Sequence, residues 1–145
     1  MLCHVMVITA MPSTLFANEY VLVLALPSEP IVEIVRKQMR VELADLDRAW
    51  GAPHRALATV ERRKSCLLVD VSATAGRNDE EFERAFAPFR QRLCADWLQV
   101  ALVVSTLPGT LQVQRYARED DARVVAFDNR DAALSALRRT LAARK

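Results

Sequence analysis

The stretch CLLVDVSATAGRNDEEFERAF, residues 66–86, contains the elements that decide the fold. Its first seven residues form a nearly continuous apolar run of strand length, which is typical of a central strand covered on both faces. Asn78 and Glu81 then have the spacing of a helix N-cap and a glutamate three residues later. The stretch therefore predicts a buried strand that leads directly into a helix. The apolar face expected for this helix consists of Phe82, Phe86, Phe89 and Leu93.

Two runs rich in β-branched residues precede this stretch. They are YVLVLALP (residues 20–27) and PIVEIVRK (residues 30–37), and the prolines and polar residues between them suit a tight turn. We expect these two runs to form an antiparallel hairpin. Residues 43–60 then carry apolar side chains at alternating gaps of three and four, which predicts an amphipathic helix. Because Pro53 falls inside it, we expect a kink, or two short helices with Pro53 in the first turn of the second.

Alternating strands and helices follow the same stretch toward the C-terminus. WLQVALVVST (residues 97–106) and ARVVAFD (residues 122–128) predict two further strands, and LPGTLQVQRYARED (residues 107–120) predicts a turn and a helix between them. Asn129 is the expected cap of a last helix. Strands that alternate with helices favour right-handed crossovers and a parallel sheet. We therefore predict an α/β fold with a mixed, mostly parallel sheet, a leading antiparallel hairpin and helices packed on the sheet.

The length of the chain favours one domain. With 145 residues, of which 52% are hydrophobic, it can bury a single substantial core. We expect residues 19–145 to form this domain and residues 1–18 to be an N-terminal extension, either disordered or an extra strand. Residues 2–11 are apolar, but they lack the positive flank of a secretory signal and are too short to span a bilayer.

Charge and cysteine content narrow the class of protein. The chain has 20 Lys and Arg against 18 Asp and Glu, a net charge of +2, which is far from the strong positive field of a nucleic-acid-binding protein. The three cysteines form no CxxC pair, and with two histidines they show no metal-ligand spacing. We therefore expect a cytoplasmic protein with no cofactor, no bound metal, no nucleic-acid partner and no membrane span.

Polar residues follow each of the predicted parallel strands. In sheets of this kind, ligands bind outside the carboxyl ends of the strands, where loops and helix N-termini meet. These residues are therefore candidates for binding a partner or an anion, although short polar side chains also satisfy turns and helix caps. Arg77 and Arg115 are the better functional candidates because a guanidinium suits carboxylate or phosphate groups. The full set is Asp70, Ser72, Thr74, Arg77, Asn78, Ser105, Thr106, Thr110, Gln112 and Arg115.

The residue patterns of common enzymes are not evident. Neither His4 nor His54 follows a predicted strand, so neither is placed to act as a base for a serine or cysteine nucleophile. Cys66 and Cys94 stand among apolar residues, as inert core thiols do. We expect a protein without catalytic residues. The enzymatic alternative is a small enzyme that uses Asp70 with Ser72 or Thr106.

Three segments carry a resemblance to a known family. They are LLVDVSATAGRNDEEFERAFAPFRQRL, VALVVSTLPGTLQVQRYARED and VVAFDNRDAALSAL, and with the leading hairpin they resemble STAS-like (SpoIIAA-like) domains over residues 19–141. The segments look like small bacterial STAS-like proteins of unassigned function. The STAS-like fold includes anti-sigma-factor antagonists and the cytoplasmic domains of sulfate transporters. The resemblance implies a non-enzymatic signalling module that binds a partner protein through the loop after the central strand.

One family feature is absent from the matching position. In the antagonists, a phosphorylated serine lies in a DSSG-like element at the start of the following helix, whereas this chain reads TAGRNDEE over residues 74–81. The phosphoserine is therefore not carried over. We expect an unidentified protein partner to contact residues 70–78 and 105–112, with a small anion or nucleotide as a further candidate ligand at the Asn78 helix start. The alternatives are a domain that binds a small ligand, lipid or nucleotide, and a homodimer formed through the edge of the hairpin.

Overall fold

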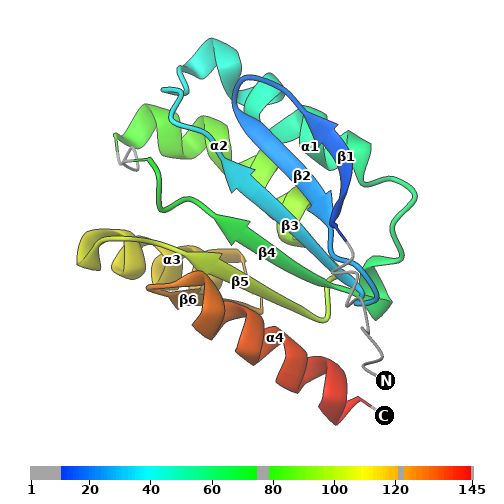
Figure 1. The fold of residues 1–145 in the computed structure, drawn as a ribbon. Helices are drawn as coiled ribbons and strands as arrows, with labels where there is room; N and C mark the ends of the chain where they lie inside the picture. Colours follow the sequence, from blue (N-terminus) through cyan, green and yellow to red (C-terminus); the bar gives the residue numbers. More distant parts are fainter. Residues whose placement is uncertain (1–10, 75–78, 121–122, 145) are drawn as a thin grey trace, which may run out of the picture.

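Six strands form one twisted sheet in the order β1-β2-β3-β4-β5-β6 (Figure 1). The computed structural model describes residues 11–74, 79–120 and 123–144. Strand β2 is antiparallel to both β1 and β3, and β4, β5 and β6 run parallel to β3. The strands are β1 (Ser13–Ala17), β2 (Val21–Ala25), β3 (Ile31–Arg36), β4 (Cys66–Asp70), β5 (Gln99–Val103) and β6 (Val124–Phe127). The mixed, mostly parallel sheet with a leading hairpin is therefore confirmed.

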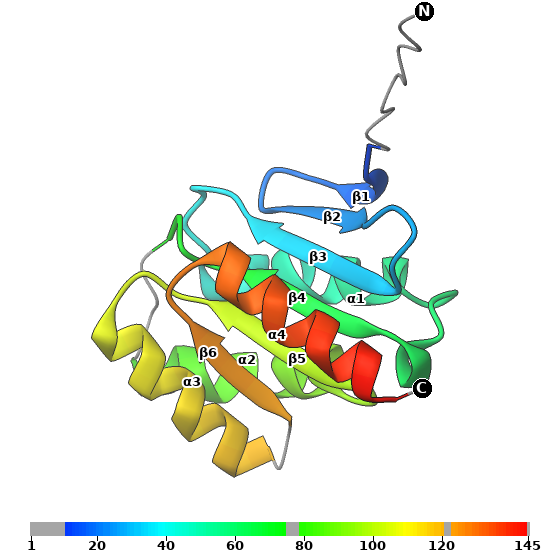
Figure 2. The ribbon, with the colours of Figure 1, turned by 60° about the horizontal axis from the view of Figure 1, so that its bottom comes forward.

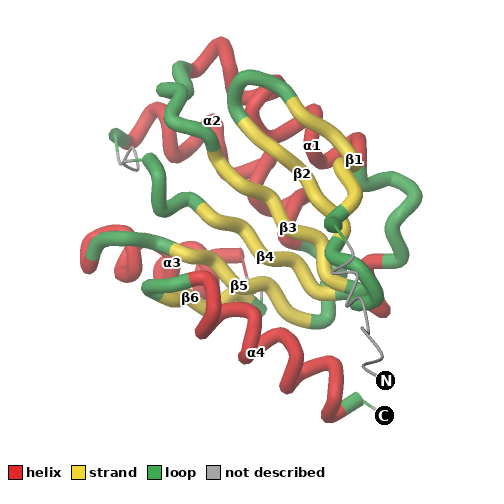
Figure 3. Tube along the Cα trace, in the orientation of Figure 1, coloured by secondary structure: helices red, strands yellow, loops and turns green. Residues whose placement is uncertain are grey.

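Helices cover both faces of the sheet (Figures 2 and 3). Helix α4 packs on one face, over β4 and β5, and α2 packs on the other with the π-helical turn η2 and α1. Helix α3 lies beside β6. The helical elements are η1 (Leu43–Asp45), η2 (Asp47–Gly51), α1 (Ala52–Ala56), η3 (Arg62–Lys64), α2 (Glu80–Cys94), α3 (Leu107–Asp120) and α4 (Arg130–Ala143).

Strand β4 is buried on both faces, as its apolar run predicts. Leu67 and Val69 point into the larger core with Phe82 of α2. Cys66 and Leu68 alternate with them and pack against α4 in a second core. This double burial removes apolar side chains from water on both sides of one strand, and the strand therefore holds the two layers of helices together.

The positions at which the helices begin test three of the sequence predictions. Short helical pieces occupy residues 43–56 of the predicted 43–60, and Pro53 lies in the first turn of α1, as the second of the two alternatives predicts. Asn129 caps α4, since its side chain accepts a hydrogen bond from the backbone N–H of Ala132. The cap predicted for α2 is wrong by one residue. The carboxylate of Asp79 accepts from the backbone N–H of Phe82, and Asp79 fits the role as well as the neighbouring asparagine would.

The segment before the hairpin contributes a strand to the sheet. Strand β1 pairs with β2 in an antiparallel register that shifts between Thr14 and Phe16. This shift turns Phe16 toward the core beside Val23. The division into an extension of residues 1–18 and a domain of residues 19–145 stays a prediction. Among the described residues, no helix is both long and apolar enough to cross a membrane.

Candidate functional site

The turn after β4 is closed by its own polar side chains. The carboxylate of Asp70 accepts from the backbone N–H of Ser72 at 3.0 Å and from the Ser72 hydroxyl at 2.5 Å. Thr74 donates its hydroxyl to the carbonyl of Val71 at 3.3 Å. These are turn-type bonds between residues two or three apart. Asp70, Ser72 and Thr74 therefore lie together at the carboxyl edge of the sheet, with much of their bonding capacity used by the turn itself.

The start of α3 uses its hydroxyls in the same way. The Thr106 hydroxyl accepts from the backbone N–H of Gly109 at 3.0 Å, and Thr110 donates its hydroxyl to the carbonyl of Thr106 at 3.2 Å. Ser105 and Thr106 are exposed. The N-terminus of α3 is thus capped by Thr106, which leaves Ser105 as the more accessible hydroxyl of this loop.

Gln112 and Arg115 contact α2. Gln112 donates its amide to the Tyr116 hydroxyl at 2.6 Å and to the carboxylate of Glu83 at 3.3 Å. The Arg115 guanidinium donates to the same carboxylate. Hydrogen bonding to Glu83 raises the pKa of Arg115. These two predicted site residues therefore fasten α3 to α2. Arg77 and Asn78 lie outside the described residues, and their role stays a prediction.

An ion pair between a buried carboxylate and a half-exposed arginine near the same edge was missed by the sequence reasoning. Glu33 of β3 is 3% exposed, and its two carboxylate oxygens accept from Arg130 Nε at 2.7 Å and Nη2 at 2.8 Å. Hydrogen bonding to Glu33 raises the pKa of Arg130, and the charge of Asp70 adds to this effect. Glu33 is a charged residue inside the apolar run IVEIV, and this was the signal that could have revealed it.

Two leucines lie exposed beside the candidate loops. Leu107 is 72% exposed and Leu111 is 57% exposed, and their spacing of four places them on one side of α3. Ser105 and Thr106 directly precede them in the chain. The carboxyl edge of the sheet therefore carries an apolar strip next to hydroxyl groups that are bonded within their own turns.

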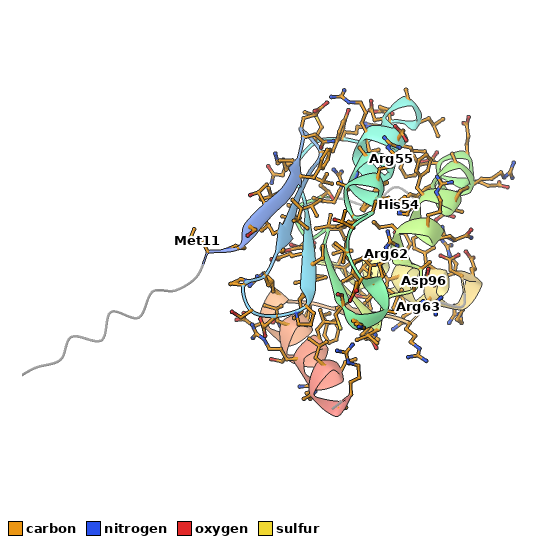
Figure 4. The ribbon with its side chains drawn as sticks, turned by 90° about the vertical axis from the view of Figure 1, so that its right-hand side faces the viewer. Met11, His54, Arg55, Arg62, Arg63 and Asp96 are labelled. Carbon is orange, nitrogen blue, oxygen red and sulfur yellow. The ribbon has the colours of Figure 1, made fainter. Side chains whose placement is uncertain are left out.

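A cleft of about 900 Å³ lies at the opposite edge, by the amino ends of β4 and β5. Figure 4 shows His54 and Arg55 of α1 above Arg62 and Arg63 of η3, with Asp96 next to η3. Sequence reasoning did not find this cleft because its residues come from two separate parts of the chain, residues 54–64 and 92–96. The lining residues are His54, Arg55, Leu57, Ala58, Val60, Glu61, Arg62, Arg63, Lys64, Arg92, Ala95 and Asp96.

Arg62 organises the wall of this cleft. Its Nη1 donates to the carbonyls of Arg92, Leu93 and Ala95 at the end of α2, at 2.8–3.1 Å, and the Leu93 carbonyl also accepts from Trp97 Nε1 at 2.7 Å. Its Nη2 lies 2.8 Å from His54 Nδ1, and its guanidinium carbon lies 5.0 Å from the centre of the Trp97 ring. A single cation thus joins α1, η3 and the C-terminus of α2.

Burial sets the protonation state of the two described thiols. Burial raises the pKa of Cys94 to about 12 and also raises that of Cys66, so both thiols are protonated at neutral pH. No group of three or more His, Cys, Asp or Glu side chains in the described part of the chain could hold a metal ion.

One solved structure places this architecture among known folds. It is the crystal structure of an uncharacterized protein from the DUF3478 family, from Shewanella loihica PV-4, with a SpoIIAA-like fold. The TM-score is 0.61, and the match covers 84% of this chain and 98% of that one. This chain has the SpoIIAA-like fold. The expected STAS-like fold is confirmed, and at 11% identity the likeness establishes the fold alone. No protein-family model matches the chain, and no curated protein matches it.

Proposed function

We propose that this protein is a non-enzymatic regulatory module that binds a partner protein at the carboxyl edge of its sheet. The binding surface consists of the described residues 70–74 and 105–111. The observation that carries the proposal is the exposed pair Leu107 and Leu111, which lies beside polar groups already bonded within their turns. Exposed apolar side chains next to satisfied polar groups are typical of surfaces that bind proteins.

The geometry of Asp70 supports binding over catalysis. A catalytic carboxylate is usually shielded from water and faces a pocket that admits the substrate. Asp70 is only half-buried at the end of β4, and one of its two carboxylate oxygens accepts from the backbone N–H and the hydroxyl of Ser72. Two described residues that often take part in catalysis lie far from this turn. His54 lies at the opposite edge of the sheet, and Cys66 lies at the other end of β4.

Helix α3 is held firmly enough to present its two leucines. Arg90 of α2 is buried, and its guanidinium binds both carboxylate oxygens of Asp120 at 2.6 and 3.0 Å. The same guanidinium lies 3.9 Å from the centre of the Tyr116 ring. Such bidentate and stacked contacts fix the helix before a partner arrives, which lowers the entropy lost on binding.

The setting that we propose is the cytosol. Cys66 and Cys94 are both free thiols, as is usual for proteins in a reducing compartment. Their burial in or beside the two cores leaves them unavailable for disulfide exchange with a partner. The proposed contact is therefore non-covalent and is made by the apolar strip of Leu107 and Leu111, called the leucine strip below.

The test compares two double variants of the full chain. A photo-crosslinking amino acid at Ser105 identifies the partner in cells, and calorimetry then measures its affinity for the purified protein. Leu107→Gln with Leu111→Gln removes the strip, and Met39→Gln with Leu43→Gln, which alters two other exposed apolar residues, is the matched control.

Burying the exposed parts of the two leucines stabilises a complex by about 2.5 kcal/mol. The strip variant should therefore bind the partner about 60-fold more weakly, and the control should bind it as the wild type does. Equal affinity of the wild type and the strip variant for the crosslinked partner would contradict the proposal.

A further inference from the structure

The cleft between α1, η3 and the end of α2 has an excess of positive charge. Its walls carry five cationic side chains, against the two acidic side chains of Glu61 and Asp96. The whole protein has a net charge of only +2. The positive charge is therefore concentrated at this cleft, where a concave surface strengthens its effect on an anion. The cations are Arg55, Arg62, Arg63, Lys64 and Arg92.

Two of these cations are engaged by the fold. Arg62 binds the carbonyls at the end of α2. Arg55 binds Asp47 in a bidentate pair, with distances of 2.8 and 3.0 Å between the guanidinium nitrogens and the carboxylate oxygens. Arg62 has no acidic partner within ion-pair distance among the described residues, so its charge still acts on the cleft.

Three cations remain available to a ligand. Arg63 and Arg92 form no ion pair within residues 11–74, 79–120 and 123–144, and both are exposed. Lys64 lies 3.7 Å from Glu61, and both side chains are largely exposed, so this pair is weak. Arg63 on η3 and Arg92 on α2 come from the two sides of the same cleft.

His54 adds a neutral hydrogen-bond donor. Because a guanidinium only donates, His54 Nδ1 accepts from Arg62, and the ring proton is on Nε2. Burial lowers the pKa of His54, and the charges of Arg62, Arg92 and Arg55 lower it further. A bound anion would offset these charges and raise the pKa again.

The floor of the cleft is apolar. Leu57, Ala58, Val60 and Ala95 line it together with the charged residues. A volume of about 900 Å³ is in the range of pockets that hold small molecules. A ligand that matches this lining has an anionic group for the arginines and an apolar body for the floor.

We infer that this cleft binds a small organic phosphate, with Arg63 and Arg92 on the phosphate and the apolar floor under its organic part. Guanidinium groups bind phosphate oxygens through charge-assisted hydrogen bonds, and the excess of cations favours a dianion over a monocarboxylate. The site is separate from the leucine strip, since the two lie at opposite edges of the sheet. This inference does not rest on the proposed protein partner.

The test uses phenyl phosphate, which combines a phosphate with an apolar ring. Two-dimensional ¹H–¹⁵N NMR of the full chain follows its titration up to about 10 mM, with inorganic phosphate and phenol as the two partial ligands. We expect shifts at the residues of the cleft, weaker binding of inorganic phosphate and no binding of phenol. The control for charge is Arg118→Gln with Arg139→Gln, two exposed arginines outside the cleft.

Arg63→Gln with Arg92→Gln should weaken phenyl phosphate binding about tenfold, whereas the control with the same change in net charge should bind as the wild type does. Thermal unfolding confirms that both variants are folded. Phenyl phosphate should also raise the pKa of His54, which NMR resolves because His4 is the only other histidine.

Three outcomes would overturn the inference. The first is no shift in the cleft at the highest concentration, and the second is equal weakening by the two double variants. The third is that single-stranded RNA or anionic vesicles bind more tightly than phenyl phosphate and that the double variant Arg63→Gln with Arg92→Gln loses this binding. That result would assign the cleft to a macromolecular anion instead.

Discussion

Replacing Arg130 by leucine removes the partner of a buried carboxylate. Glu33 is 3% exposed and binds Arg130 through both oxygens, at 2.7 and 2.8 Å. A buried charge that loses its partner destabilises a protein by about 3–5 kcal/mol. The Arg130 side chain is 44% exposed, so water reaches the pair, and we take the lower end of this range. Arg130→Leu should therefore lower the free energy of unfolding by about 3 kcal/mol.

Removing both charges should cost far less. In Glu33→Leu with Arg130→Leu, no charge remains buried, and leucine suits the neighbouring apolar core formed by Ile31, Leu68 and Leu134. Replacing both partners of a buried ion pair by apolar residues is often nearly neutral. We expect the double variant to lie within about 1 kcal/mol of the wild type.

Urea unfolding followed by tryptophan fluorescence measures these differences. Trp50 and Trp97 are both buried, so their emission reports the loss of the core. In a domain of this size, 3 kcal/mol corresponds to a fall in Tm of about 10 °C. A loss below about 1 kcal/mol in Arg130→Leu, or a double variant as unstable as the single one, would refute the reasoning.

Three further predictions concern other contacts. Burial lowers the pKa of His54 below 6.5, so the folded protein binds fewer protons than the unfolded chain, and its stability should fall as pH decreases below 6.5. In urea unfolding measured from pH 7 to pH 5, His54→Gln should remove this loss. Arg62→Gln leaves the carbonyls of Arg92 and Ala95 at the end of α2 without this donor, whereas the Leu93 carbonyl keeps Trp97 Nε1. The variant should lower the free energy of urea unfolding by about 2 kcal/mol, and a loss below about 0.5 kcal/mol, the level expected for the surface change Arg118→Gln, would contradict this. Asp79→Ala removes the cap of α2 and should cost about 1 kcal/mol in thermal unfolding, and Asp79→Asn should restore most of it; equal loss in both would contradict the cap.

Local patterns in the sequence were sufficient to predict most of the fold. The continuous apolar run of β4 reflects burial on both faces of the strand, and the spacing of apolar residues in α2 reflects burial of one face of the helix. Both patterns can be read from neighbouring residues alone. The cap of α2 shows the limit of this reasoning. Two residues of types that cap equally well, Asn78 and Asp79, stand side by side in the sequence, and the structure shows the Asp79 carboxylate accepting from the backbone N–H of Phe82.

The candidate sites were less predictable because they depend on contacts between distant residues. Arg62 and the carbonyl of Arg92 are 30 residues apart, and Glu33 and Arg130 are 97 residues apart. A helix pattern also does not reveal which of its apolar residues a neighbour covers. In α3, Val113 is buried while Leu107 is exposed, and only the position of α3 beside α2 and β6 distinguishes them.

Hydrogen exchange of the protein with its crosslinked partner tests the central claim most directly. The proposed surface predicts slower amide exchange on binding in residues 70–74 and 105–111, with no change at the cleft residues of η3. Protection that appears at η3 and the end of α2, with none around Leu107 and Leu111, would contradict the claim that the carboxyl edge of the sheet binds the partner.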